Sequence, residues 1–100
     1  MVTYEVTATV APGLVEAYAT YMKVQHIPDV LATGCFTGAV FEQADGTTFR
    51  ARYQAASQER IDAYLREHTA RLRDDFARHF PEGISFRRAV WTEQKRWTPR

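Results

Sequence analysis

The chain has 100 residues, of which 45% are hydrophobic and 25% are charged, and its formal net charge is +1. This length gives room for one domain with a single core, and the composition excludes a disordered chain. The small net charge argues against a nucleic-acid partner, and the lack of a long apolar run or a signal-peptide pattern argues against a membrane.

The first two predicted elements are a strand and a helix. Apolar residues alternate with threonine and glutamate over residues 2–10, which is typical of a strand with one buried face. Pro12 suits the opening of a helix, because its missing N–H needs no partner there. The stripe of that helix comprises Leu14, Tyr18, Tyr21, Met22 and Gln25. Pro28 disfavours helical geometry at Ile27, so we predict a kink or break there, then a short helical turn that stops at Gly34.

The middle of the chain predicts a hairpin and a long helix. Residues 35–42 and 47–55 read as strands, and the sequence Ala44-Asp45-Gly46 between them is a signal for an antiparallel hairpin. Ser57 offers an N-cap to the helix that follows. The apolar stripe of this helix is Ile61, Leu65, His68, Leu72, Phe76 and Phe80. Its spacing of three and four residues predicts one amphipathic helix that ends before Pro81.

The chain closes with a strand and a tail. Alternation from Ile84 to Trp91 predicts the last strand, and residues 94–100 are polar and basic. We expect one domain over residues 1–93 followed by this tail. Two β-α-β units in series, with right-handed crossovers, give an α+β ferredoxin-like βαββαβ sandwich. Its four antiparallel strands form one sheet, with both helices on one face.

The sheet face without helices is predicted to be polar in its middle. The outward residues of the first and third strands are Thr3, Glu5, Thr7, Thr9, Thr48, Arg50, Arg52 and Gln54. The second strand presents either Phe36, Gly38 and Val40 or the alternate set Cys35, Thr37, Ala39 and Phe41. This face meets either water or the same face of a second subunit, where Glu5 could pair with Arg50 or Arg52.

Two segments carry a family resemblance. Residues 26–34 read HIPDVLATG and residues 64–73 read YLREHTARLR. With the order of elements, they resemble a family of short bacterial proteins of unknown function, over nearly the whole chain up to about Val90. That family is similar to the dimeric α/β-barrel superfamily, which includes cofactor-less monooxygenases and muconolactone isomerase-like enzymes. The resemblance implies a homodimer through the open sheet face and a pocket between sheet and helices, but no particular activity.

Three residues are candidates for catalysis. His26 stands where a histidine recurs in several enzymes of that superfamily, and imidazole moves protons near neutral pH. The alternative is a helix-terminal histidine that bonds free carbonyl groups. His68 lies on the helix stripe near Tyr64 and Arg71, where it is either a second base or a core histidine with a polar partner. Arg71 could hold an anion, or it could pair with Glu67 on the surface.

The tyrosines are the candidate ligand-binding residues. They could line a pocket with inward hydroxyls or form the core with solvated tips, and they are Tyr4, Tyr18, Tyr21, Tyr53 and Tyr64. Cys35 is expected to be a buried packing residue and, as the single cysteine, fits a cytoplasmic location. We expect no metal or cofactor, because the three histidines are far apart in the sequence. The third strand lacks the glycine and paired aromatics of an RNA-binding sheet.

Two functional hypotheses follow. The favoured one is a small dimeric protein that binds a small hydrophobic or acidic metabolite. The alternative is a cofactor-less monooxygenase or isomerase, with His26 or His68 as general base and Arg71 stabilising an oxyanion. The alternative requires these three side chains to converge on one pocket, whereas a binding protein does not.

Overall fold

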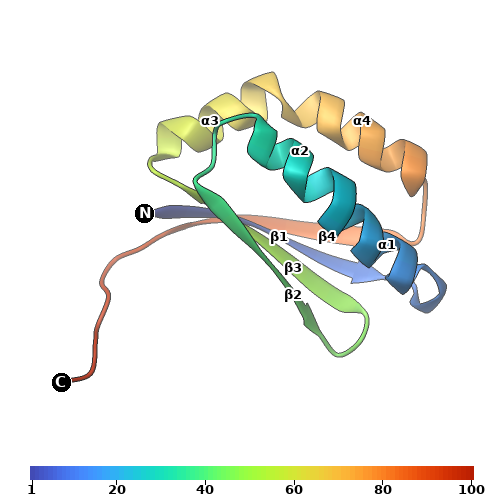
Figure 1. The fold of residues 1–100 in the computed structure, drawn as a ribbon, viewed down its shortest axis with the longest axis horizontal. Coiled ribbons are helices and arrows are strands. Elements are labelled where there is room, and N and C mark those ends of the chain that lie inside the picture. Colours follow the sequence, from blue (N-terminus) through green and yellow to red (C-terminus); the bar gives the residue numbers. More distant parts are fainter.

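One four-stranded antiparallel sheet carries all the helices on one face (Figure 1). The computed structural model describes residues 1–100. The strands are β1 (Val2–Val10), β2 (Gly38–Ala44), β3 (Thr48–Ala55) and β4 (Ile84–Thr92), in the spatial order β2-β3-β1-β4. The helices are α1 (Val15–Tyr21), α2 (Ile27–Ala32), α3 (Gln58–Glu67) and α4 (Thr69–His79). The arrangement confirms the ferredoxin-like βαββαβ fold, and none of these helices has the length and apolar character needed to cross a bilayer.

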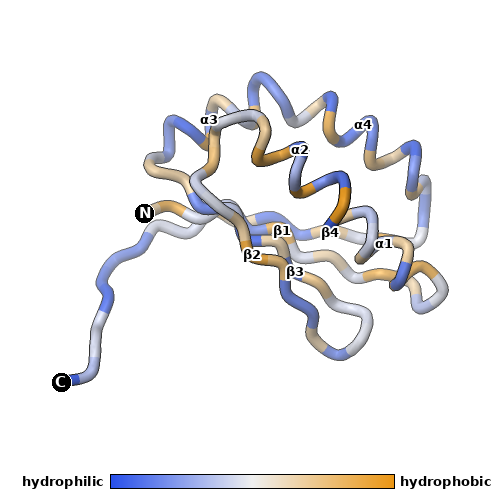
Figure 2. The backbone as a smooth tube through the Cα atoms, viewed as in Figure 1, coloured by the Kyte–Doolittle hydropathy of each residue, from blue (hydrophilic) through white to orange (hydrophobic).

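The register of the central strand decides which side chains meet the helices. In β1, Tyr4 lies opposite Tyr53 of β3 and Val90 of β4. Side chains alternate between the two faces of a sheet, so the even-numbered residues of β1 face the helices together with Tyr53 and its alternate neighbours. Figure 2 shows the matching pattern on α4, where hydrophilic and hydrophobic residues alternate along an amphipathic helix.

The opposite face of the sheet is polar in its middle, as predicted. Glu5 Oε1 lies 3.6 Å from Nε of Arg50 and 3.6 Å from Nε of Arg52 within the same chain. Glu5 Oε2 accepts a hydrogen bond of 2.9 Å from Trp91 Nε1. The charges that could have paired across two subunits are therefore already paired along one sheet.

The first helix runs past Pro28 without a break, although its α-helical geometry is interrupted just before that residue. The helix begins with a 3-10 turn at Pro12–Leu14 and continues to α2 through a π-helical segment, Met22–His26. At its end the Ile27 N–H donates to the carbonyl of Met22, five residues back. Pro28 has no N–H to donate, and the wide turn carries the helix past this gap. The predicted stop at Gly34 is confirmed, since Gly34 adopts a φ of +78°.

The second helix is divided at His68, so the prediction of one long helix is wrong. His68 has a φ of −124°, outside helical geometry, and it separates α3 from α4. The Thr69 hydroxyl donates to the carbonyl of Tyr64 at 3.2 Å, in competition with the backbone ladder. The apolar spacing gave no sign of this break, because the residues on both sides of it still face the sheet. Ser57 is the N-cap residue, but its side chain makes no capping hydrogen bond.

The second strand begins at Gly38, three residues later than predicted. Cys35 and Phe36 are both buried, which confirms the packing role of Cys35 and separates Phe36 from the alternative open-face set of Phe36, Gly38 and Val40. The Phe36 ring centroid lies 5.3 Å from that of Tyr53 and 5.0 Å from that of Tyr64. Val40 then points to the open face opposite Arg52.

The hairpin from β2 to β3 turns at Asp45 and Gly46, as predicted. Their φ values are +54° and +72°, and with Thr47 they form a three-residue connection, since Ala44 pairs with Thr48.

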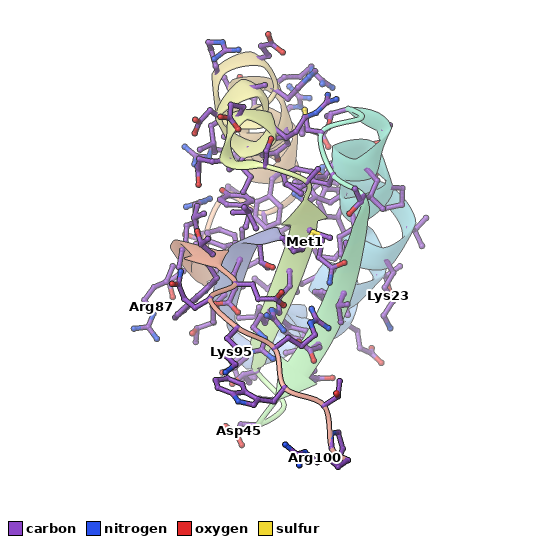
Figure 3. The ribbon with its side chains drawn as sticks, turned by 90° about the vertical axis from the view of Figure 1, so that its left-hand side faces the viewer. Met1, Lys23, Asp45, Arg87, Lys95 and Arg100 are labelled. Atoms are coloured by element: carbon purple, nitrogen blue, oxygen red, sulfur yellow. The ribbon has the colours of Figure 1, made fainter.

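Residues 93–100 form no helix or strand and extend from the body of the molecule (Figure 1). A shallow groove between this tail and the open sheet face includes Arg52, Gln54 and Trp97. Figure 3 shows Lys95 and Arg100 on the side of the sheet away from the helices.

The placement of Phe36 can be tested by stability. Phe36→Ala should lower the free energy of unfolding by about 3–5 kcal/mol, because it leaves a cavity among stacked rings. Val40→Ala, at a side chain on the open face, should cost less than about 0.5 kcal/mol. Denaturant unfolding measures both. Equal effects of the two substitutions would contradict the buried position of Phe36.

Candidate functional site

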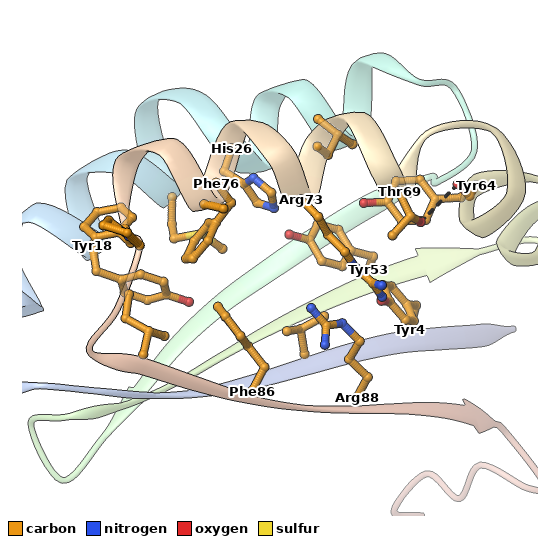
Figure 4. A pocket seen from close by; sticks show the side chains of 17 residues that line it. Tyr4, Tyr18, His26, Tyr53, Tyr64, Thr69, Arg73, Phe76, Phe86 and Arg88 are labelled. Atoms are coloured by element: carbon orange, nitrogen blue, oxygen red, sulfur yellow. Dashed lines mark hydrogen bonds between the residues drawn. The ribbon is translucent and has the colours of Figure 1, made fainter.

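A cavity of about 320 Å³ lies between α4 and the β1–β4 half of the sheet (Figure 4). Twelve of its 17 lining residues are hydrophobic, so most of the surface offered to an occupant is apolar. Its volume is roughly that of ten molecules of liquid water. This size lies at the lower end of the range for sites that bind small organic molecules.

Aromatic rings enclose one end of the cavity. Phe76 of α4 meets Tyr18 of α1 and Phe86 of β4 in edge-to-face contacts, with ring centroids 6.1 Å and 5.1 Å apart. Phe80 also lies edge-on to Tyr18, at 6.1 Å. Such contacts fix the rings in orientation. A flat, apolar ligand would therefore meet preformed ring surfaces at this end.

His26 is the one candidate catalytic residue that lines the cavity. Its Nδ1 atom is buried and has no hydrogen-bond partner, which leaves Nε2 as the accessible ring nitrogen. Burial lowers the pKa of the imidazole below its usual value of 6.5, while the charges of Asp29 and Asp75 act in the opposite direction. His26 is therefore neutral at pH 7. The π-helical segment that ends at His26 sets where this side chain points.

Four of the five candidate ligand-binding tyrosines also line the cavity, namely Tyr4, Tyr18, Tyr53 and Tyr64. Burial raises the pKa of Tyr64 to about 12 and raises the pKa of Tyr53 as well, so both hydroxyls stay protonated. These hydroxyls make no hydrogen bond within the protein, whereas the Thr69 hydroxyl nearby donates to the Tyr64 carbonyl (Figure 4). The cavity therefore contains hydrogen-bond donors that a ligand can engage.

Tyr21, the remaining tyrosine of that set, lies outside the cavity. Its hydroxyl donates to Asp75 Oδ2 at 2.6 Å, and Gln25 Nε2 donates to the same oxygen at 3.1 Å. Hydrogen bonds from Tyr21 and Arg78 hold the pKa of the Asp75 carboxyl below its usual value. These contacts join the first helix to α4 next to His26, which gives Tyr21 a structural place rather than a contact with an occupant.

His68 and Arg71 do not converge with His26. They contact each other outside the cavity, with Arg71 Nη2 3.1 Å from His68 Nδ1. Glu67, the alternative partner of Arg71, forms its ion pair with Arg66 instead, at 3.5 Å. No group of three or more His, Cys, Asp or Glu side chains gathers where it could hold a metal ion.

Two arginines that the sequence analysis did not single out, Arg73 and Arg88, line the cavity. A signal for each was present in the sequence. Arg88 stands in the inward set of the last strand, where its neighbours Phe86 and Val90 are apolar. Arg73 falls four residues after Thr69 on the stripe of the second helix that turns toward the sheet.

The chain belongs to the family described as a domain of unknown function, DUF4286, whose model matches residues 1–94. The membership confirms the resemblance to a family of unknown function. No curated protein matches the chain significantly.

Solved structures with the same fold include oxygenases. A monooxygenase from the gene ActVA-Orf6 of Streptomyces coelicolor, in complex with Nanaomycin D, is 16% identical, with a TM-score of 0.76 over 99% of this chain and 92% of that one. SnoaB, a cofactor-independent oxygenase from Streptomyces nogalater, is 12% identical, with a TM-score of 0.69 over 95% and 94%. A dimeric ferredoxin-like protein from an uncultured marine organism is 6% identical, with a TM-score of 0.65 over 98% of each chain. At these identities the likeness shows the fold alone.

The neutral state of His26 predicts a pH dependence of stability. A histidine whose pKa is lowered in the folded protein binds a proton more readily in the unfolded chain. Its contribution to the free energy of unfolding is therefore complete above pH 6.5 and is lost as the pH falls below that value. The melting temperature should therefore fall between pH 7 and about pH 5, and His26→Phe should make that fall smaller. Phe76→Leu changes another lining residue of the cavity without removing an ionisable group. This variant should show the same change of melting temperature with pH as the wild type. An unchanged slope in His26→Phe would contradict the burial of a neutral imidazole.

Proposed function

We propose that the protein binds a small, largely apolar ring compound in the cavity between α4 and the sheet. The observation that carries this proposal is a cavity with mostly hydrophobic walls in which the His26 ring and the hydroxyls of Tyr53 and Tyr64 make no hydrogen bond within the protein. A core histidine or tyrosine that served stability alone would find a hydrogen-bond partner inside the fold. Here these groups remain available, which is the usual composition of a small-molecule site.

Each polar group has a defined role in this proposal. The hydroxyls of Tyr53 and Tyr64 are protonated donors for an oxygen atom of the ligand. His26 is neutral, so its Nε2 can accept or donate one hydrogen bond according to its tautomer. Tyr4 supplies ring surface between them, with its centroid 6.2 Å from that of Tyr53 and 5.9 Å from that of Tyr64.

A second candidate function is that of a cofactor-less monooxygenase or isomerase, with His26 as the general base. A neutral imidazole inside an apolar cavity can take a proton from a phenol or from a carbon acid next to a carbonyl. The two structural neighbours that are described as oxygenases favour this candidate. His68 and Arg71 lie outside the cavity. Of the three candidate catalytic residues, the enzyme hypothesis therefore keeps only His26.

Ligand binding can be measured by thermal shift with a panel of small aromatic compounds. A compound present at about 100 times its dissociation constant should stabilise the wild type by roughly 2.7 kcal/mol. Val6→Phe and Ala77→Leu place extra volume at two lining positions and should remove the shift. Val24→Phe, at an exposed helix position, should keep it.

The same titration separates the two candidates. Oxygen uptake or product formation that disappears in His26→Phe would select the enzyme, and binding without turnover would select the binding protein. Equal shifts in the wild type and in Val6→Phe would contradict a ligand in this cavity.

We also propose that the protein is a homodimer whose subunits meet through their open sheet faces. Trp91 and Val40 are exposed on this face at 55% and 45%, and Trp97 of the tail is exposed at 76%. Arg52 Nε is buried there without a hydrogen-bond partner. A structural neighbour described as a dimeric ferredoxin-like protein supports the same assembly.

We also propose that the protein is located in the cytoplasm, as expected from the sequence.

Sedimentation equilibrium tests the dimer. The wild type should have twice the chain mass of 11.5 kDa at micromolar concentration. Trp91→Glu should weaken the dimer roughly thirtyfold, because an aromatic residue that anchors an interface contributes about 2 kcal/mol or more. Val24→Glu likewise replaces an exposed hydrophobic side chain with a carboxylate, but on the helix-covered side of the sheet. This control should leave the dimer intact. A wild type of 11.5 kDa at every concentration would remove the proposal.

A further inference from the structure

Arg73 and Arg88 carry the only formal charges that line the cavity at neutral pH. No aspartate or glutamate is among the lining residues, and His26 is neutral. Neither arginine takes part in an ion pair within the chain. By contrast, Arg78, which also lies on α4, pairs with Asp75 at 3.2 Å. The cavity thus has two positive charges and no negative charge to balance them.

The two guanidinium groups approach from opposite walls. Figure 4 shows Arg73 descending from α4 and Arg88 rising from β4, on the side of the cavity where Tyr4 and Tyr64 lie. Burial raises the pKa of the Tyr64 hydroxyl, and the positive charges of Arg73 and Arg88 lower it. The guanidinium carbon of Arg88 lies 5.3 Å from the centroid of the Phe86 ring, and this contact keeps its charge over a wall of the cavity.

This arrangement matches one kind of ligand. A carboxylate accepts paired hydrogen bonds from the planar fork of a guanidinium, and two forks facing the same space can hold both of its oxygens. The rest of the lining is apolar and aromatic, so the remainder of the molecule must be apolar too. Both arginines are exposed residues, which places the anion at the mouth and the apolar body inside.

We propose that the ligand of the cavity is a small aromatic carboxylic acid, with its carboxylate held between Arg73 and Arg88 and its ring system enclosed by the aromatic end. This inference rests on the proposed binding function and adds the chemical class of the ligand. The far end of the ligand would then reach His26, whose accessible nitrogen can bond a hydroxyl or carbonyl group there.

Matched probes test the carboxylate directly. Isothermal titration calorimetry of the full-length protein compares a naphthoate with the naphthamide of the same shape, which lacks the charge. The wild type should bind the naphthoate at least about tenfold more tightly, since hydrogen bonds to a charged group are the stronger ones. Arg73→Gln and Arg88→Gln should each weaken naphthoate binding about tenfold and change naphthamide binding less than about twofold.

Two control variants remove the same charge from the same elements. Arg78→Gln lies on α4 and Arg87→Gln on β4, and neither residue lines the cavity. Both should bind the naphthoate as the wild type does. A uniform loss in all four variants would mean that only the net charge matters, and it would overturn the paired site.

The failures of the two proposals are distinguishable. If the wild type binds naphthoate and naphthamide equally well, the cavity still binds ring compounds and the carboxylate site is wrong. If Arg73→Gln and Arg88→Gln bind naphthoate as tightly as the controls do, the carboxylate site is again wrong. If neither probe binds to the wild type, the binding function itself is overturned, and the inference about its ligand falls with it.

Discussion

The pairing of β1 with a strand on each side is the constraint on which the rest of the structure depends. A shift of one residue in either ladder would move every side chain of that strand to the opposite face. In the observed register Tyr4 points toward the helices with Tyr53, and Glu5 points away from them toward Arg52. The aromatic wall of the cavity and the charged centre of the open face are therefore two results of a single register.

The helices depart from regular α-helical geometry at two places, and both departures affect the cavity. The π-helical turn before Ile27 compensates for the missing N–H of Pro28 and ends at His26, which it directs inward. The division at His68 starts α4 afresh at Thr69, and α4 then places Arg73 and Phe76 along the cavity. Local backbone chemistry thus determines which side chains the cavity receives.

The polar groups of the cavity form a consistent chemical set. Burial keeps the imidazole of His26 uncharged and the tyrosine hydroxyls protonated, because charged forms are poorly solvated there. Arg73 and Arg88 keep their charge because guanidinium groups stay protonated and because both reach solvent at the mouth. The cavity is therefore neutral inside and positive at its edge, an arrangement that orients an amphipathic ligand.

The sequence by itself determined the βαββαβ order, the hairpin at Asp45 and the polar centre of the open face, because these follow from alternation and turn chemistry close in the chain. It also pointed to His26 and to most of the cavity tyrosines. Only the tertiary structure showed that His68 and Arg71 lie apart from His26, and that Arg73 and Arg88 share its cavity. The physical reason is that periodicity fixes the face of an element on which a residue lies. Which residues of distant elements meet depends on breaks and crossovers that the hydrophobic pattern does not record.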